Sequence, residues 1–159
     1  MPNVIRNIFE QYVIDRFDLQ DCIAVTNGTS ALIGALWSMD LKPDDEVITT
    51  PLTFIATSNA VLIAGGKPVF VDINPETLLI DVDKIEAAIT EKTKAIIPVH
   101  LYGRVCQMDK IKELADKYDL VVIEDTAQGF GATDHLGRHA GMMCDVGTFS
   151  FYKTKNIST

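Results

Sequence analysis

Short apolar runs alternate with amphipathic segments along almost the whole chain. Runs rich in valine and isoleucine are each followed by a stretch with apolar residues at helical spacing. Continuous apolar strands between helices are typical of a parallel β-sheet whose two faces are both covered. We predict strands at 21–25, 46–50, 68–73, 95–99, 121–124 and 146–151, and helices at 4–17, 31–39, 54–64, 83–89 and 108–118. The pattern therefore predicts a three-layer α/β/α fold with a mostly parallel sheet.

Two details of the pattern concern the predicted helices. Apolar side chains recur at helical intervals in the first one, at Ile5, Ile8, Phe9, Tyr12, Val13 and Phe17. Asp81 precedes the helix at 83–89 and is expected to cap its N-terminus. Because no repeat, low-complexity tract or linker interrupts the alternation, we predict one domain over residues 1–159.

The composition is that of a soluble globular protein, with 47% hydrophobic and 23% charged residues. A chain of 159 residues buries roughly two-thirds of the surface that its unfolded form exposes. The formal net charge of −8 disfavours nucleic acids and anionic membranes as partners, because both reward clustered Lys and Arg. No apolar run approaches the roughly 20 residues that span a bilayer. The N-terminus lacks a signal-peptide core, so we expect a cytoplasmic protein.

Cysteine and histidine are too scattered to predict a metal site. Cys22, Cys106 and Cys144 lack metal-ligand spacing, and we interpret them as reduced thiols. The three histidines share no motif, so no zinc site is predicted.

Ligands of such sheets bind at the carboxyl ends of the strands, and the first unusual strand end is the small polar stretch 27–30. Free amides at a helix N-terminus, the helix dipole and the hydroxyls of Thr29 and Ser30 would bind a phosphate. The alternative is ordinary N-capping by Thr29 or Ser30. Neither a Walker-type pattern nor a GxGxxG motif is present, so a nucleoside triphosphate is not favoured.

The second unusual strand end carries two carboxylates, Glu124 and Asp125. Alternation along a strand sends them to opposite faces, so one should point away from the site, toward the next helix. A carboxylate at the strand end can hold a cationic ring nitrogen or a metal. The alternative for Asp125 is a helix cap.

The third is the last predicted strand, which runs to Ser150 and Phe151 and is followed by Lys153 and Lys155. Desolvation beside a buried strand favours the neutral amine of a lysine, which is the form that attacks a carbonyl carbon to give a Schiff base. The alternative is a solvated lysine near the end of the chain.

The three strand ends together match the needs of pyridoxal phosphate. Its phosphate must be anchored, its pyridinium nitrogen kept protonated and its aldehyde held as an imine. Each signal is weak alone, and their occurrence together in this order is much stronger.

The residues also carry a family resemblance over nearly the whole chain, from about Phe9 to Asn156. The chain resembles the DegT-type nucleotide-sugar aminotransferases, which are fold-type I pyridoxal-phosphate enzymes. The blocks that carry the resemblance are Thr26-Asn-Gly-Thr-Ser-Ala-Leu, Asp45-Glu-Val-Ile-Thr-Thr-Pro-Leu-Thr-Phe-Ile-Ala-Thr, Lys67-Pro-Val-Phe-Val-Asp-Ile, Pro98-Val-His-Leu-Tyr-Gly, Ile123-Glu-Asp-Thr-Ala-Gln and Phe149-Ser-Phe-Tyr-Lys-Thr-Lys-Asn.

The resemblance implies that Lys155 binds the cofactor as a Schiff base and shuttles protons once it is freed. Asp125 would pair with the pyridinium nitrogen, and Gln128 would lie beside the ring and its phenolic oxygen. Lys153 stands where relatives often have proline. Lys155 is preferred as the cofactor lysine because Asn156 follows it, as in the Thr-Lys-Asn of the family.

The same resemblance places an aromatic ring and three hydroxyls around the cofactor. Phe54 would stack on the ring face, and its alternative is packing in the core. The phosphate would be held by Thr29, Ser30 and Ser150. His100 and Tyr102 follow another strand and border the expected site, and no role is assigned to them.

This chain departs from the family in its length, because family members are more than twice as long. They continue after the lysine into a further strand and a smaller C-terminal domain, and their active site lies at a dimer interface. The further strand lies between the strands that correspond to 21–25 and 146–151, so we expect both to have an unpaired edge here. We therefore interpret residues 1–159 as an incomplete large domain without the small domain, from a protein that would be a homodimer if complete.

The implied function is transfer of an amino group from a donor such as glutamate to a nucleotide-linked keto-sugar, as in polysaccharide biosynthesis. Two alternatives stay open. One is a sugar dehydratase on the same scaffold; in those relatives histidine replaces the cofactor lysine, so Lys155 favours transamination. The other is an inactive truncated remnant, or a fragment that needs a complementary chain.

Overall fold

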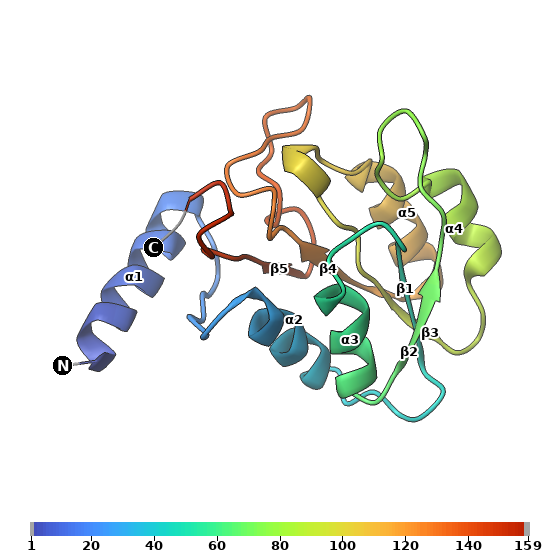
Figure 1. Cartoon of the computed structure of the whole chain (residues 1–159), viewed down its shortest axis with the longest axis horizontal. Coiled ribbons are helices and arrows are strands. Elements are labelled where there is room, and N and C mark those ends of the chain that lie inside the picture. Colours follow the sequence, from blue (N-terminus) through green and yellow to red (C-terminus); the bar gives the residue numbers. More distant parts are fainter. Residues whose placement is uncertain (1, 158–159) are drawn as a thin grey trace.

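The structure is a computed structural model that describes residues 2–157. Its strands are β1 (Glu46–Thr49), β2 (Lys67–Phe70), β3 (Thr93–Ile96), β4 (Val121–Asp125) and β5 (Val146–Thr148). They form one sheet in the order β2-β1-β3-β4-β5, in which every neighbouring pair is parallel (Figure 1). The predicted parallel sheet is therefore confirmed.

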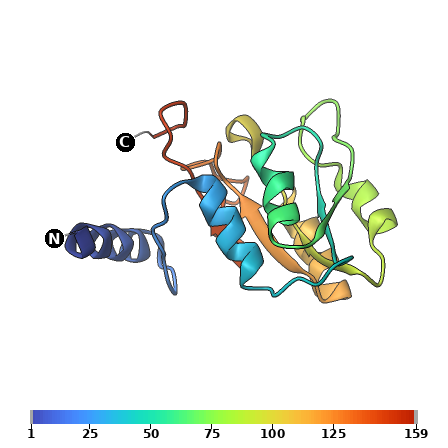
Figure 2. The same cartoon turned by 60° about the horizontal axis from the view of Figure 1, so that its bottom comes forward.

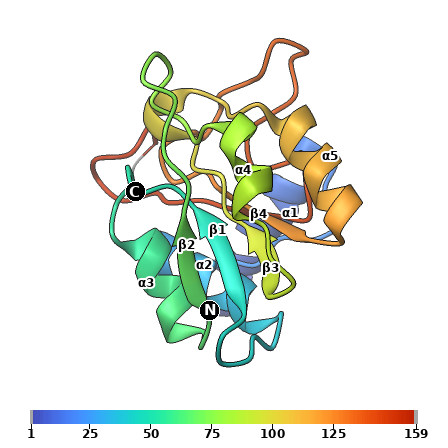
Figure 3. The same cartoon turned by 90° about the vertical axis from the view of Figure 1, so that its right-hand side faces the viewer.

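Helices cover both faces of this sheet. The described helices are α1 (Pro2–Phe17), α2 (Gly28–Trp37), α3 (Ala56–Ile63), α4 (Val82–Ala88) and α5 (Met108–Tyr118), with a short 3-10 helix η1 (Leu101–Gly103). α2 and α3 pack on one face, and α4 and α5 pack on the other (Figures 1 and 3). Asp81 caps α4 as predicted, because its side chain accepts a hydrogen bond from the amide of Asp83. The three-layer arrangement is confirmed.

Each central strand divides its apolar side chains between two cores. On β1, Val47 packs with α2 and α3, whereas its neighbour Ile48 packs with α4 and α5. On β4, Ile123 and Val122 divide in the same way. Successive side chains of a strand point to opposite faces, so a sheet covered on both sides needs an unbroken apolar run.

Several strands are shorter than predicted, because a strand ends where its partner ends. β5 stops at Thr148, which pairs with Asp125, the last residue of β4. β2 and β3 also stop about three residues before their predicted ends, at Phe70 and Ile96. Beyond them, single isolated bridges replace a continuous ladder.

The strand predicted at 21–25 is wrong. The segment is irregular, and the side chain of Ile23 is 76% exposed. The amide of Ala24 donates to the carboxylate of Glu10 at 2.8 Å instead of to a neighbouring strand. Within residues 2–157, β5 is the last strand of the sheet and pairs with β4 alone. The free edge expected at β5 is therefore present, and the segment 21–25 has no strand beside it to pair with.

α1 lies to one side of the layers (Figure 2). Val13 is buried, and the ring of Phe9 meets that of Phe151 edge-on at 5.7 Å between centroids. Ile5 and Ile8, which belong to the same predicted face, are 74% and 65% exposed. Tyr12 is 64% exposed as well, so Val13 alone of that apolar face is buried. Among the described helices, none has the length and hydrophobicity that crossing a bilayer requires.

Candidate functional site

Three predicted segments meet at the carboxyl edge of the sheet. β4 ends in Asp125, and the neighbouring β5 leads through Ser150 to Lys155. The N-terminus of α2 comes so close to this exit that a Cβ at Gly28 would lie 2.9 Å from the Cβ of Ser150. Only a residue without a side chain allows α2 to begin here. The three segments that the sequence singled out, two strand ends and the N-terminus of α2, therefore meet at one edge of the sheet.

The Asp125 carboxylate is buried and receives one hydrogen bond on each oxygen. The hydroxyl of Thr57 donates to Oδ2 at 2.8 Å, and the amide of Ala127 donates to Oδ1 at 3.1 Å. In the described part of the chain a turn, not a helix, follows β4. The alternative that Asp125 caps a helix is therefore wrong.

Burial is the largest influence on the pKa of the Asp125 carboxyl. Desolvation raises the pKa of this carboxyl, and the hydrogen bonds from Thr57 and Ala127 and the nearby His100 and Lys155 lower it. Across residues 2–157, no lysine or arginine forms an ion pair with it. The site thus contains a buried carboxylate that has hydrogen-bond donors but no cationic side chain bound to it.

Glu124 points to the opposite face, as alternation predicts. Its Oε2 lies 2.9 Å from Nε2 of His100, and both side chains are fully buried. Its oxygens also accept hydrogen bonds from the amides of Gly141, Met143 and Cys144. Glu124 therefore binds the loop that precedes β5, and the expectation that it would reach the next helix is wrong.

The N-terminus of α2 is capped by Asn27, whose side-chain oxygen accepts a hydrogen bond from the amide of Ser30 at 2.9 Å. The interpretation that Thr29 or Ser30 is the cap is therefore wrong, since both lie within the first turn. The hydroxyl of Ser30 is 2.9 Å from that of Thr26. The first-turn amides of a helix have no intrahelical partner and point outward. This corner therefore offers hydroxyls and amides to an anion.

Lys155 lines an open cavity of about 560 Å³ together with Tyr102, Gln128, Thr154 and Asn156. Gln128 is held by its side-chain oxygen, which accepts a hydrogen bond from the amide of Tyr102 at 3.3 Å. Tyr102 has a φ of 54°, in the left-handed region that non-glycine residues rarely adopt. Backbone strain of this kind concentrates at functional sites.

Two further residues named in the sequence analysis, Lys153 and Phe54, lie on the surface. Lys153 is exposed, with its ammonium 5.9 Å from the centre of the Tyr152 ring, and it does not belong to the residues that line the cavity. Phe54, between β1 and α3, is 66% exposed. The alternative that Phe54 packs in the core is therefore wrong.

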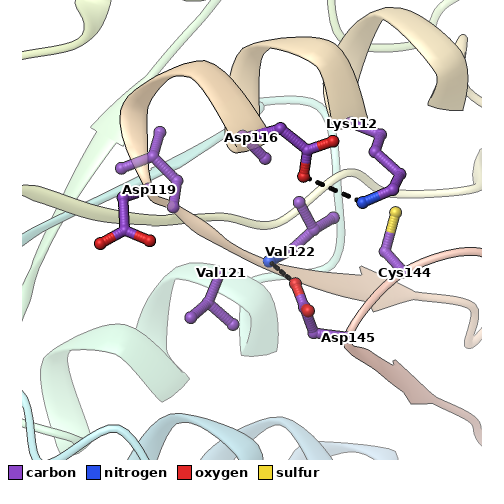
Figure 4. A pocket seen from close by; sticks show the side chains of 9 residues that line it. Lys112, Asp116, Asp119, Val121, Val122, Cys144 and Asp145 are labelled. Atoms are coloured by element: carbon purple, nitrogen blue, oxygen red, sulfur yellow. Dashed lines mark hydrogen bonds and ion pairs between the residues drawn. The ribbon is translucent and has the colours of Figure 1, made fainter.

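A second cavity, of about 320 Å³, lies at the amino ends of β4 and β5, away from the carboxyl edge that carries the site (Figure 4). There Lys112 pairs with Asp116, and Asp145 accepts a hydrogen bond from the amide of Val122. Burial, with the nearby carboxylates of Glu124 and Asp145, raises the pKa of the Cys144 thiol to about 12. A thiol with so high a pKa is a poor nucleophile. This cavity contains none of the predicted site residues.

Sequence reasoning missed Thr57, which contacts the site directly. Thr57 closes the Thr-Phe-Ile-Ala-Thr block that contains Phe54, but it lies 68 residues from Asp125 in sequence. Its place in that block was the only signal, and threonines in a helix usually have no such role. Tyr102 was noted as a neighbour of the site, and the structure adds that it lines the cavity and holds Gln128.

Comparison with known proteins identifies the family of this site. Residues 5–159 match the profile of the DegT/DnrJ/EryC1/StrS aminotransferase family. The chain belongs to this family. The resemblance stated from the sequence is thereby confirmed.

Two curated members of the family show how much of the chain is shared. The chain is 48% identical over 151 residues to GDP-perosamine synthase from Caulobacter vibrioides, a match that covers 95% of the chain and 40% of that enzyme. It is also 48% identical over 149 residues to 3-oxo-glucose-6-phosphate:glutamate aminotransferase from Bacillus subtilis, covering 94% of the chain and 33% of that enzyme. The chain therefore spans two-fifths or less of the length of these relatives.

A solved structure of this kind supports the fold. NtdA from Bacillus subtilis, determined with the bound cofactor PMP, superposes with a TM-score of 0.88 at 45% identity. The match covers 96% of the chain and 34% of NtdA. The fold-type I class expected from the sequence is therefore confirmed for this part of the molecule.

Proposed function

We propose that the chain is the cofactor-binding part of a pyridoxal-phosphate-dependent aminotransferase. It would take an amino group from a donor such as glutamate and transfer it to a nucleotide-linked keto-sugar. The observation that carries the proposal is the buried Asp125 carboxylate at the end of β4, with Lys155 nearby on the exit from β5. The name of GDP-perosamine synthase supports a nucleotide-linked sugar, and the name of 3-oxo-glucose-6-phosphate:glutamate aminotransferase supports a keto-sugar with glutamate as the donor.

The residues present fit the cofactor. A buried carboxylate without an ion-pair partner is destabilising, and a cationic pyridinium nitrogen would neutralise it. The first turn of α2 and the hydroxyls beside it supply the donors that a phosphate needs. The side chains proposed to hold the phosphate are Thr29, Ser30 and Ser150. Phe54, exposed just before the N-terminus of α3, is proposed to cover the cofactor ring.

The remaining residues would hold the ring and move protons. When bound, the cofactor would supply an electron sink for the carbanion that forms when the amino donor loses a proton. Asp125 would hold the proton on the ring nitrogen. Lys155 would bind the cofactor covalently through Nζ and then move protons with the same atom. Gln128, held by the amide of Tyr102, would orient the ring from the side.

The proposal extends to the domain organisation. Residues 1–159 would form part of the large domain of the longer enzyme, and the strand that pairs with the free edge of β5 would come from outside them. The homodimer and the cytoplasmic location stay predictions from the sequence.

The test of the function is covalent trapping of the cofactor. We expect pyridoxal phosphate, followed by borohydride, to give a stable adduct that peptide mass spectrometry locates on Lys155. Lys155→Ala should lose this adduct, because no other side chain that lines the cavity has an amine. Lys153→Ala, two positions away on the exposed side, is the matched control and should retain it. An adduct that survives in Lys155→Ala, or that disappears in Lys153→Ala, would contradict the assignment.

A further inference from the structure

Thr57 lies at the contact between α3 and the end of β4. Its side chain is buried, and its hydroxyl oxygen is 2.8 Å from Oδ2 of Asp125. Two other groups approach the same hydroxyl: Oγ1 of Thr53 at 2.9 Å and the carbonyl oxygen of Phe54 at 3.2 Å. A threonine hydroxyl has one proton to donate and two lone pairs that accept. Asp125 and Phe54 therefore compete for one donated proton.

The chemistry of the acceptors determines where this proton lies. A hydrogen bond to a carboxylate is charge-assisted and roughly twice as strong as one to a neutral oxygen. The contact with Asp125 is also the shortest of the three. The Thr57 proton therefore points to Asp125, and Thr57 accepts in turn from the hydroxyl of Thr53. The result is a directed chain of donors from Thr53 through Thr57 to Asp125.

The carboxylate depends on this chain for its orientation and for its charge. Thr57 on Oδ2 and Ala127 on Oδ1 fix the plane of the Asp125 carboxylate. The other titratable groups that act on it are His100 and Lys155, and within residues 2–157 neither makes a side-chain hydrogen bond to it. Without Thr57, burial would favour the neutral acid, which attracts no cation.

We propose that Thr57 is a positioning residue of this site. Its hydroxyl, supported by Thr53, holds the Asp125 carboxylate oriented and ionised for a cationic ring nitrogen. Thr53 and Thr57 flank Phe54, so the same chain ties the segment that carries the exposed ring to Asp125. The identity of the cation rests on the proposed function, whereas the hydrogen-bond chain does not.

The test is a ¹³C NMR titration of the Asp125 side-chain carboxyl in the 159-residue chain, without added ligand. Thr57→Val removes the hydroxyl at nearly the same volume and should raise the Asp125 pKa by about one unit, because one charge-assisted donor is lost. Thr57→Ser should restore the wild-type titration. Thr49→Val is the matched control, since the buried Thr49 hydroxyl donates to the carbonyl of Ile97 and should leave Asp125 unchanged.

An Asp125 titration that is the same in Thr57→Val and in the wild type overturns the inference, as does an equal shift in Thr49→Val. If Thr57→Val does not fold, Thr53→Val takes its place, and it should raise the Asp125 pKa by a smaller amount; no change would then overturn the inference. The cofactor is tested separately. A wild-type chain that forms no adduct with pyridoxal phosphate contradicts the proposed function, and the titration still decides the role of Thr57.

Discussion

Asp125 combines two opposing requirements in a single residue. Its desolvated carboxylate destabilises the folded chain, and its charge is what the proposed cationic ring nitrogen would need. Because burial raises its pKa in the folded state above the value of about 3.9 typical of an unfolded chain, the folded state binds more protons between those two values. Its contribution to stability therefore falls as the pH rises through that window. This is the pattern expected where stability is lower for the sake of function.

The corresponding prediction concerns Asp125→Asn. Asparagine can accept from Ala127 and donate to Thr57, whose proton then turns to the carbonyl of Phe54, so every contact stays satisfied. We expect the chain to become more stable at pH 7 by roughly 1–2 kcal/mol and to show almost no gain below about pH 3, where the aspartic acid is mostly neutral in both states. Urea denaturation at both pH values measures this.

The exposed Asp44→Asn is the control for this comparison and should change stability by less than about 0.5 kcal/mol at either pH. A gain that is equal at both pH values would show that the charge of Asp125 is not the cause.

At the scale of elements, the connection from β4 to β5 depends on two glycines that touch. Gly141 has a φ of +80°, and its backbone lies directly against Gly147 in β5. A Cβ at Gly147 would overlap the carbonyl oxygen of Gly141, which cannot move aside as a flexible side chain could. This contact determines where β5 begins and so where Ser150 and Lys155 lie after it.

We therefore expect Gly147→Ala to lower the free energy of unfolding by at least about 2 kcal/mol, through displaced backbone. Gly34→Ala provides the matched comparison. Gly34 is exposed in α2, and apart from the backbone of its own helix and its chain neighbours nothing lies within 4 Å of the position a Cβ would take. Alanine there should stabilise the chain by about 1 kcal/mol. In thermal denaturation, the Tm of Gly147→Ala should fall and the Tm of Gly34→Ala should rise relative to the wild type. Equal effects would mean that the contact between the glycines is not required.

At the scale of the whole molecule, Glu124 joins segments that are distant in sequence. Its carboxylate receives four donors: the ring of His100 after β3 and three amides of the loop before β5. The Nδ1 of His100 accepts from the amide of Cys106, so Nε2 carries the proton that is donated to Glu124. Glu124 and Asp125, adjacent on β4, therefore divide their tasks: one fixes the fold, and the other faces the site.

Glu124→Gln should be strongly destabilising, by about 3 kcal/mol. The amide has one acceptor oxygen, and its NH₂ group would face two of the four buried donors. Glu113→Gln, on the exposed side of α5, should change stability by less than about 0.5 kcal/mol. Urea denaturation measures both variants. A loss in Glu124→Gln no larger than in Glu113→Gln would contradict the network.

The fold could be predicted because its signals are local. Unbroken apolar runs such as that around Val122 and Ile123 indicate a strand buried on both faces, and alternation correctly separated Glu124 from Asp125. The segment 21–25 was misjudged for the opposite reason. Its side chains, such as Ile23, have the propensity of a strand, but a strand forms only with a neighbour, and propensity contains no information about neighbours.

Apart from the strand expected at 21–25, the sequence by itself determined the order of the main helices and strands, the family resemblance, and the ends of β4 and β5 where polar side chains gather. Only the tertiary structure decided which groups touch there. It made Asn27 the cap of α2, exposed Phe54, separated Lys155 from Lys153 at the cavity and brought Thr57 to Asp125. Hydrophobic periodicity repeats within a few residues and can be recognised along the chain. A hydrogen bond across 68 residues depends on how whole elements pack, which no local pattern contains.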